Sequence, residues 1–127
     1  MSSLRPTLAI AMGGAVGALF RFWVATGVYA VAGRDFPYGT LAVNVVGCLV
    51  MGLLYEVLLD RVTFGVELRA GLLIGLLGAF TTFSTFSLET LALVEQGEAT
   101  KALANVILSV LLCMGGVWVG VFLGRQL

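Results

Sequence analysis

The sequence predicts an all-α integral membrane protein with four transmembrane helices. Of its 127 residues, 60% are hydrophobic and only 11% are charged, and the mean hydropathy is +1.08. Soluble domains average about 25% charged residues, because water must solvate their surfaces. Seven basic and seven acidic residues give no net charge, so a basic nucleic-acid-binding surface is excluded. There is no histidine, which makes a soluble enzyme improbable, and no enzymatic activity is expected.

Four apolar stretches define the predicted helices of this single domain, residues 1–127. Each stretch approaches or exceeds the roughly 20 residues that cross a hydrocarbon core. We place the helices at about 7–33, 36–59, 66–95 and 100–125. Charged residues gather in the connections, among them Asp60 and Arg61. With four spans, both termini lie on the same side of the bilayer.

Glycines recur at helical spacing in three of the four helices. The rows are Gly13 and Gly17; Gly71 and Gly75; and Gly116, Gly120 and Gly124. Rows of small residues let helix backbones approach closely in lipid. They indicate tight helix packing and supply a means of dimerisation, which a four-helix chain needs in order to enclose a polar pathway.

The orientation in the membrane is only weakly specified. Four basic residues lie on the side of the termini and two on the other, namely Arg5, Arg61, Arg69 and Arg125 against Arg34 and Lys101. This bias fits a single orientation with cytoplasmic termini. It fits equally well a dual orientation, which would permit an antiparallel homodimer.

Residues 80–87 (FTTFSTFS) place five hydroxyls and three phenylalanines in the third helix, directly after Gly75 and Gly78. Hydroxyls at this depth can bond to backbone groups where a helix bends or breaks. We therefore predict a discontinuous third helix, whose second half offers amide groups to an anion and whose freed carbonyls could hold a cation. The alternative is an unbroken helix whose hydroxyls bond to the preceding turn.

Phe80, Phe83 and Phe86 recur every three residues and form a stripe on one face of this helix. Such a stripe usually packs against other helices. The alternative is that its rings face a pore, where the positive ring edges favour an anion.

Polar side chains also recur at helical spacing in the second and fourth helices. Thr40 and Asn44 share one face of the second, and Asn105, Ser109 and Cys113 share one face of the fourth. Each set either bonds to a neighbouring helix or lines a pathway.

Arg21 is the only formal charge deep within a predicted helix. It either extends to the membrane interface or stands in a wet vestibule that attracts anions. No carboxylate lies deep in any of the four segments, which disfavours cation and proton-coupled exporters. Cys48 and Cys113 both lie in apolar stretches, so no disulfide is expected.

Three segments resemble the signatures of the bacterial Fluc/CrcB fluoride channels: residues 17–22 (GALFRF), 39–48 (GTLAVNVVGC) and 75–86 (GLLGAFTTFSTF). The resemblance spans essentially the whole chain. It implies an antiparallel homodimer in the bacterial inner (plasma) membrane, with two fluoride pores and a structural sodium ion at the dimer centre. Transport would be passive and would let toxic cytoplasmic fluoride leave the cell.

The resemblance also implies roles for the residues of the break and the second helix. Phe83 and Phe86 match the aromatic pair that lines the fluoride pores, and Asn44 matches a pore-facing asparagine. Ser84 and Thr85 lie in the broken turn beside the pore.

Further implied roles concern the fourth helix and the cation. Asn105, Ser109 and Cys113 fall on the polar track of the family, although hydroxyl-bearing residues are usual at its two ends. Gly78 and Thr81 match the positions whose backbone carbonyls hold sodium.

The residues and the resemblance agree on an anion pathway. Fluoride is small and strongly hydrated, so a pore must replace its water with hydrogen-bond donors and positive ring edges. The expected partners are fluoride, a second copy of the chain and the lipid bilayer. The alternative function is a small multidrug-type four-helix exporter, which would need a membrane carboxylate, typically in the first helix, where this chain has Arg21.

Overall fold

The computed structural model describes residues 3–59 and 64–127, and every regular element among them is a helix. In chain order they are α1 (Leu4–Ala32), α2 (Tyr38–Leu59), α3 (Val66–Arg69), the π-helix η1 (Ala70–Leu76), α4 (Leu77–Phe80), α5 (Phe83–Glu95) and α6 (Ala99–Arg125). Four segments are long and apolar enough to span a membrane: α1, α2, residues 66–95 and α6. The predicted fold class is thereby confirmed. Asp60 and Arg61 lie outside the described residues.

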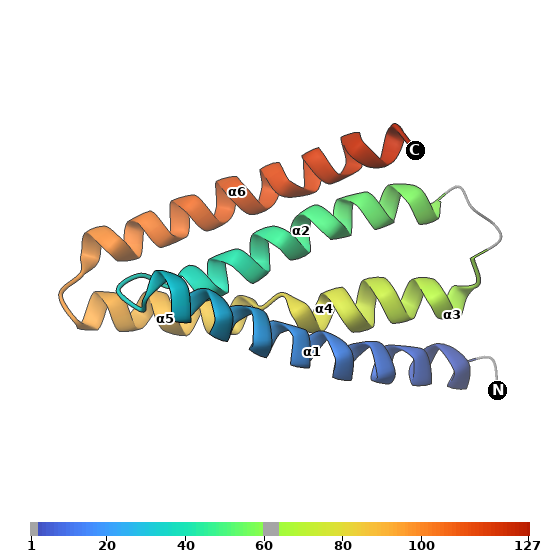
Figure 1. Cartoon of the computed structure of the whole chain (residues 1–127), viewed down its shortest axis with the longest axis horizontal. Helices are drawn as coiled ribbons and strands as arrows, with labels where there is room; N and C mark the ends of the chain where they lie inside the picture. Colours follow the sequence, from blue (N-terminus) through green and yellow to red (C-terminus); the bar gives the residue numbers. More distant parts are fainter. Residues whose placement is uncertain (1–2, 60–63) are drawn as a thin grey trace.

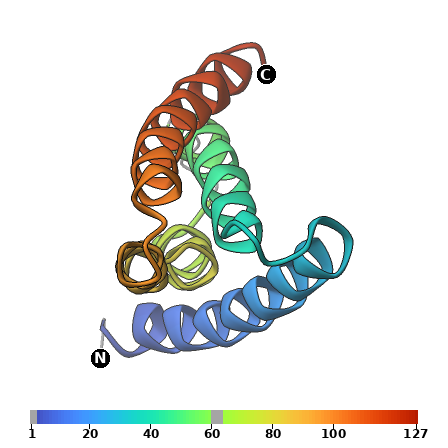
Figure 2. The same cartoon turned by 90° about the vertical axis from the view of Figure 1, so that its left-hand side faces the viewer.

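The four spans run along the long axis of the molecule, and the N- and C-termini lie at the same end (Figure 1). The α1–α2 and α5–α6 connections lie at the opposite end. Figure 2 shows α2 and α6 side by side, while α1 crosses at a steep angle next to the third span. The two most extensive helix contacts are therefore α2 with α6 and α1 with η1.

Glycines bring α1 and the third span into backbone contact. A Cβ atom at Gly13 would collide with the carbonyl oxygen of Gly71, and one at Gly17 with that of Leu76. On the opposite helix, a Cβ at Gly75 would lie 2.6 Å from the carbonyl oxygen of Ile10. Only glycine fits at this separation, which confirms that these rows serve tight packing.

The α2–α6 contact is built in the same way. A Cβ at Gly120 would collide with the carbonyl oxygen of Leu49, and one at Gly52 with that of Val117. The glycine rows are therefore used within a single chain. A second copy would have to contact other surfaces of the chain.

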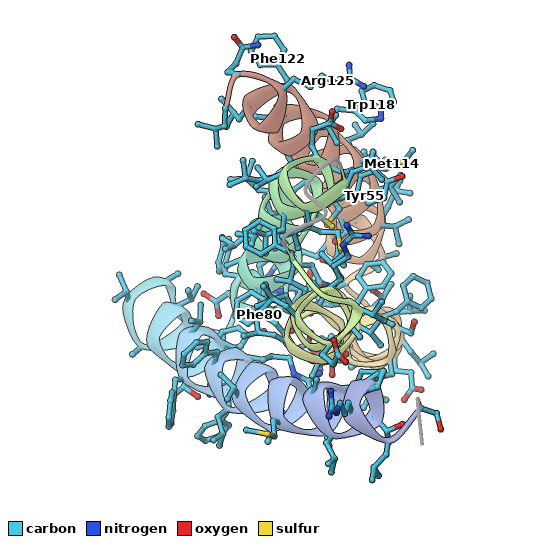
Figure 3. The ribbon with its side chains drawn as sticks, turned by 90° about the vertical axis from the view of Figure 1, so that its right-hand side faces the viewer. Tyr55, Phe80, Met114, Trp118, Phe122 and Arg125 are labelled. Atoms are coloured by element: carbon cyan, nitrogen blue, oxygen red, sulfur yellow. The ribbon has the colours of Figure 1, made fainter. Side chains whose placement is uncertain are left out.

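Many large apolar side chains are left on the outside of the bundle. Met114, Trp118 and Phe122 project from α6 and are 56%, 72% and 62% exposed (Figure 3). Exposed aromatic and aliphatic side chains over most of a helix are expected where lipid, and not water, surrounds the protein.

The third span departs from α-helical geometry twice. In η1 the backbone is wound in the wider π form, and the amide of Leu77 donates to the carbonyl of Leu72, five residues back. The helix then stops at Thr81 (φ −87°, ψ 158°) and Thr82 (φ −151°, ψ 125°), which are extended. Figure 1 shows the uncoiled ribbon between α4 and α5. Figure 2 shows that α5, the second half of the third span, is offset to the side of the first half. The predicted break is confirmed, and the alternative of an unbroken helix is wrong.

The glycine contacts predict opposite effects for two substitutions in α6. Gly120→Ala forces a methyl group against the α2 backbone and should reduce the free energy of unfolding by about 1–3 kcal/mol. Gly115→Ala meets nothing within 4 Å and should be neutral or stabilising by up to about 1 kcal/mol, because alanine favours helix. The melting midpoints of the two detergent-solubilised variants test this. Equal midpoints would contradict it.

Candidate functional site

The helix break is held by one side chain of α2. The Oδ1 atom of Asn44 accepts a hydrogen bond from the backbone amide of Thr82 (2.7 Å), and its Nδ2 donates to the carbonyl of the same residue (2.9 Å). Asn44 thus satisfies both backbone groups of an extended residue, as a neighbouring strand would. Leaving either group buried and unpaired would cost about 1–3 kcal/mol.

Thr82 also caps the second half of the third span. Its Oγ1 accepts a hydrogen bond from the amide of Thr85 (3.2 Å), and its hydroxyl donates to Oγ1 of the same residue (3.1 Å), while the Ser84 hydroxyl lies 3.4 Å away. Threonine is a preferred N-cap residue for this reason. The N-terminal turn of α5, with its positive end of the helix dipole, therefore begins at the break itself.

Beside the break lies a cavity of about 340 Å³ between α2, α5 and α6. Its lining contains no charged side chain and consists of Asn44, Cys48, Thr81, Thr82, Phe83, Phe86, Ser109, Val110, Cys113 and Met114. The structure therefore brings together half of the predicted site residues, namely Asn44, Thr81, Phe83, Phe86 and Ser109. Thr82 lies in the break and also lines the cavity. It belongs to the hydroxyl-rich run of residues 80–87 but was not among the predicted site residues.

The three phenylalanines of the stripe have different environments. Phe80 is 7% exposed and packs next to Gly47 of α2, so it belongs to the core (Figure 3). Phe83 is 79% exposed, and its ring lies 5.4 Å from that of Phe86 at an angle of 44°. The break separates the two groups, since Phe80 ends α4 and Phe83 begins α5. Packing within the chain therefore accounts for Phe80 and leaves Phe83 facing outward.

The polar side chains of α6 connect it to α5. Asn105 is only 1% exposed; its Nδ2 donates to the Thr90 hydroxyl (2.9 Å) and its Oδ1 accepts from the Ser109 hydroxyl (3.4 Å). The Thr90 hydroxyl in turn donates to the carbonyl of Phe86 (2.7 Å). Ser109 reaches the cavity, whereas Asn105 lies behind it and fixes the position of α5.

A second cavity, of about 280 Å³, lies on the other side of the break between α1, α2 and α5. Arg21 lines it together with Thr40, Thr82 and Thr85, so a positive charge stands close to the start of α5. Ser84, which also belongs to the first turn, is exposed.

Tyr29 and Glu89 also line this second cavity, and sequence patterns did not single them out. The Tyr29 hydroxyl donates to Oε2 of Glu89 (3.0 Å) and lies 3.4 Å from the Thr40 hydroxyl. Oε1 of Glu89 is buried without a hydrogen-bond partner among the described residues. Glu89 directly follows residues 70–88, which carry no charge, and nothing in its local sequence indicates a tyrosine 60 residues away.

Backbone carbonyls near the break have lost the amides that a continuous helix would give them. The amide of Thr82 would bond to the Gly78 carbonyl, but it donates to Asn44. The amide of Thr85 would bond to the Thr81 carbonyl, but it donates to the Thr82 side chain. Oxygen ligands of this kind suit a hard cation. Among the described residues, no cluster of three or more His, Cys, Asp or Glu offers an alternative metal site.

Comparisons with known proteins identify a single family. Residues 8–121 match the family described as CrcB-like protein, Camphor Resistance (CrcB). A protein of Methylococcus capsulatus named fluoride-specific ion channel FluC is 58% identical over 94% of this chain and 52% of its own length. Proteins of the same name from Geobacter sulfurreducens and Hydrogenovibrio crunogenus are 56% and 48% identical, over 94% of this chain and over 97% and 90% of their own lengths. The chain thus spans about half of the Methylococcus protein and nearly all of the other two.

The cap at the break generates a stability prediction. Thr82→Val keeps the side-chain shape but removes the acceptor for the Thr85 amide, and should cost about 1–2 kcal/mol of the free energy of unfolding. Thr82→Ser keeps the acceptor and should cost less. Ser87→Ala is the control, because the Ser87 side chain is exposed and its hydroxyl donates to the carbonyl of Phe83 in the preceding turn. Thermal melting in detergent should rank Thr82→Val lowest; any other order would contradict the capping role.

Proposed function

Because the chain belongs to the CrcB-like family, we propose that it is a passive, fluoride-selective channel that lets cytoplasmic fluoride leave the cell and so reduces its toxicity. The protein is a multi-pass membrane protein of the bacterial inner membrane, and its function is transport and not catalysis. The observation that carries the proposal is the uncharged cavity beside the helix break, in a chain whose relatives are named fluoride channels.

The cavity supplies what a dehydrated fluoride ion requires. Ser109 provides a hydroxyl, and Nδ2 of Asn44 has a second N–H besides the one that bonds to Thr82. The rings of Phe83 and Phe86 can present their positive edges. Because no carboxylate lines the cavity, no fixed negative charge repels the anion. Fluoride is favoured over larger anions by the narrowness of such a path and by donors that replace its hydration shell.

Arg21 attracts the anion without coordinating it in the uncharged cavity. The cavity that Arg21 lines is separated from the uncharged cavity by Thr82 and lies next to the N-terminal turn of α5. A guanidinium in a partly enclosed site raises the local concentration of anions over several ångströms. Arg21 therefore acts as a vestibule residue, while the donors of the uncharged cavity act on an ion that has lost its water.

The exporter alternative lacks its central group. A proton-coupled exporter of this size would need a membrane carboxylate, typically in the first span, and α1 contains no Asp or Glu. The relatives carry the name of a channel and not of an exporter.

We extend the proposal to an antiparallel homodimer with two fluoride pores and a central structural sodium ion. The 79% exposure of Phe83 supports a second copy, since a pore needs a wall opposite this ring. The altered hydrogen bonding of the Gly78 and Thr81 carbonyls supports the cation, and the two copies would each contribute these oxygens. Bound sodium would supply a positive charge that relieves the repulsion between crowded carbonyl dipoles.

The channel function is tested by anion efflux from liposomes containing the purified protein. With a potassium ionophore to carry the compensating charge, fluoride should be released and chloride retained, and a proton gradient should have no effect. Chloride release as fast as fluoride release would overturn the proposal.

The ring variants separate a pore role from packing. Phe83→Ile and Phe86→Ile keep apolar bulk but remove the positive ring edge, and each should reduce fluoride release nearly to that of empty liposomes. Asn44→Leu should do the same, with an additional loss of stability because Thr82 loses two hydrogen bonds. Leu111→Ile, an exposed position on α6, is the matched control. Normal fluoride release by both phenylalanine variants, with assembly intact on gel filtration, would show that the rings only pack.

The sodium ion is tested by removing it. After prolonged exchange into a sodium-free medium in which N-methylglucamine replaces sodium, with potassium kept only for the ionophore, fluoride release should fall and return when sodium is restored. Thr81→Ser should be mild and Gly78→Val severe. A Cβ atom at Gly78 meets only ordinary contact within the chain, 3.8 Å from the Leu73 carbonyl oxygen, so a severe effect would arise from the partner copy. Full release without sodium would eliminate the cation and leave the channel function standing.

A further inference from the structure

We propose that Cys48 and Cys113 form a binding site for a soft, thiophilic cation, of which Hg²⁺ is the test case, and that its occupation blocks the cavity beside the break. The blocking role rests on the proposed channel function, whereas the binding site does not. The two thiols come from different helices, α2 and α6, and both line the same cavity.

The geometry pairs the two sulfur atoms. Both cysteines are free thiols and half-buried, and both contribute to the lining of the cavity between α2 and α6. The close approach of α2 and α6 places the turn after Cys113 beside Cys48, since a Cβ at Gly116 would lie 3.6 Å from the Cβ of Cys48. Met114, with a third sulfur, lines the same cavity. A pair of ligands fixed by the backbone needs little reorganisation to bind an ion.

The chemistry of the lining selects a soft cation. Thiolates prefer soft metals, whereas hard cations prefer carboxylate and carbonyl oxygen. The cavity holds no carboxylate and the chain holds no histidine, so the ligand set that would complete a zinc site is missing there. Hg²⁺ instead favours a linear complex with two sulfur ligands, which this pair can supply.

The binding step conserves charge and involves no redox change. Each S–H bond breaks, each proton passes to water, and each sulfur donates an electron pair to the metal, so that two thiols and Hg²⁺ give a neutral bis-thiolate complex and two protons. A neutral complex avoids the cost of a net charge in an apolar cavity. The bound ion lies between the helices that carry Asn44 and Ser109, in the space through which fluoride would pass.

Thiol counting tests the site independently of transport. Purified protein, freed of reductant and shown to contain two reactive thiols after denaturation, is titrated with HgCl₂. One Hg²⁺ per chain should consume both thiols. Consumption of one thiol per ion, or an initial absence of free thiols because the pair has become a disulfide, would overturn the proposal.

Transport tests the blocking role, with each variant compared with its own uninhibited rate. HgCl₂ should stop fluoride release by the unmodified protein, dithiothreitol should restore it, and MgCl₂ should have no effect. Cys48→Ser and Cys113→Ser each retain one reactive thiol and should need about 100-fold more HgCl₂, because the second ligand no longer acts intramolecularly. Cys113→Thr replaces any variant that fails to assemble. If the single variants are as sensitive to HgCl₂ as the unmodified protein, the two cysteines do not form a shared site. If the protein still conducts fluoride after Hg²⁺ has consumed both thiols, the blocking role is refuted and the binding site stands.

Discussion

The structure depends on the pair of hydrogen bonds between the Asn44 amide and the backbone of Thr82. A membrane offers no water to an interrupted helix, so every amide and carbonyl released by a break must be satisfied by protein. One carboxamide has a donor and an acceptor in the right geometry for a single extended residue. Asn44 therefore allows the third span to stop and restart at membrane depth. This interruption places the groups that line the candidate site.

Three consequences follow from this interruption. The start of α5 is placed in the middle of the third span, at membrane depth, where its helix dipole is not screened by bulk water. The chain direction changes between Phe80 and Phe83. Phe80 therefore lies in the core, whereas Phe83, only three residues later, lines the cavity. The amides of Thr82 and Thr85 turn to side chains, which changes the environment of the Gly78 and Thr81 carbonyls. The proposed anion site and the proposed cation site would thus derive from the same local event.

The features that could be predicted from sequence are those with a local or periodic signal. The four spans follow from hydropathy, the break from the hydroxyl run, and the backbone contacts of Gly13, Gly17 and Gly120 from helical spacing. The π-helical winding of η1, whose Gly71 and Gly75 lie against α1, has no comparable signal in the sequence. The pairing of Tyr29 with Glu89 joins residues far apart in sequence and needs the fold. For the same reason the sequence could not distinguish Asn105, which is buried as a connector, from Ser109, which reaches the cavity.

The distribution of charge around the break explains how an anion could be admitted without being trapped. Charged groups, Arg21 and Glu89, line the cavity on one side of Thr82, and the cavity on the other side has none. A full positive charge inside a low-dielectric path would bind fluoride so strongly that it could not leave. Hydroxyl, amide and ring-edge donors are weaker, and several of them can exchange one ion in turn. Selectivity would then come from the sum of small interactions that fit a small anion, while Arg21, the proposed vestibule residue, would attract the anion outside the path.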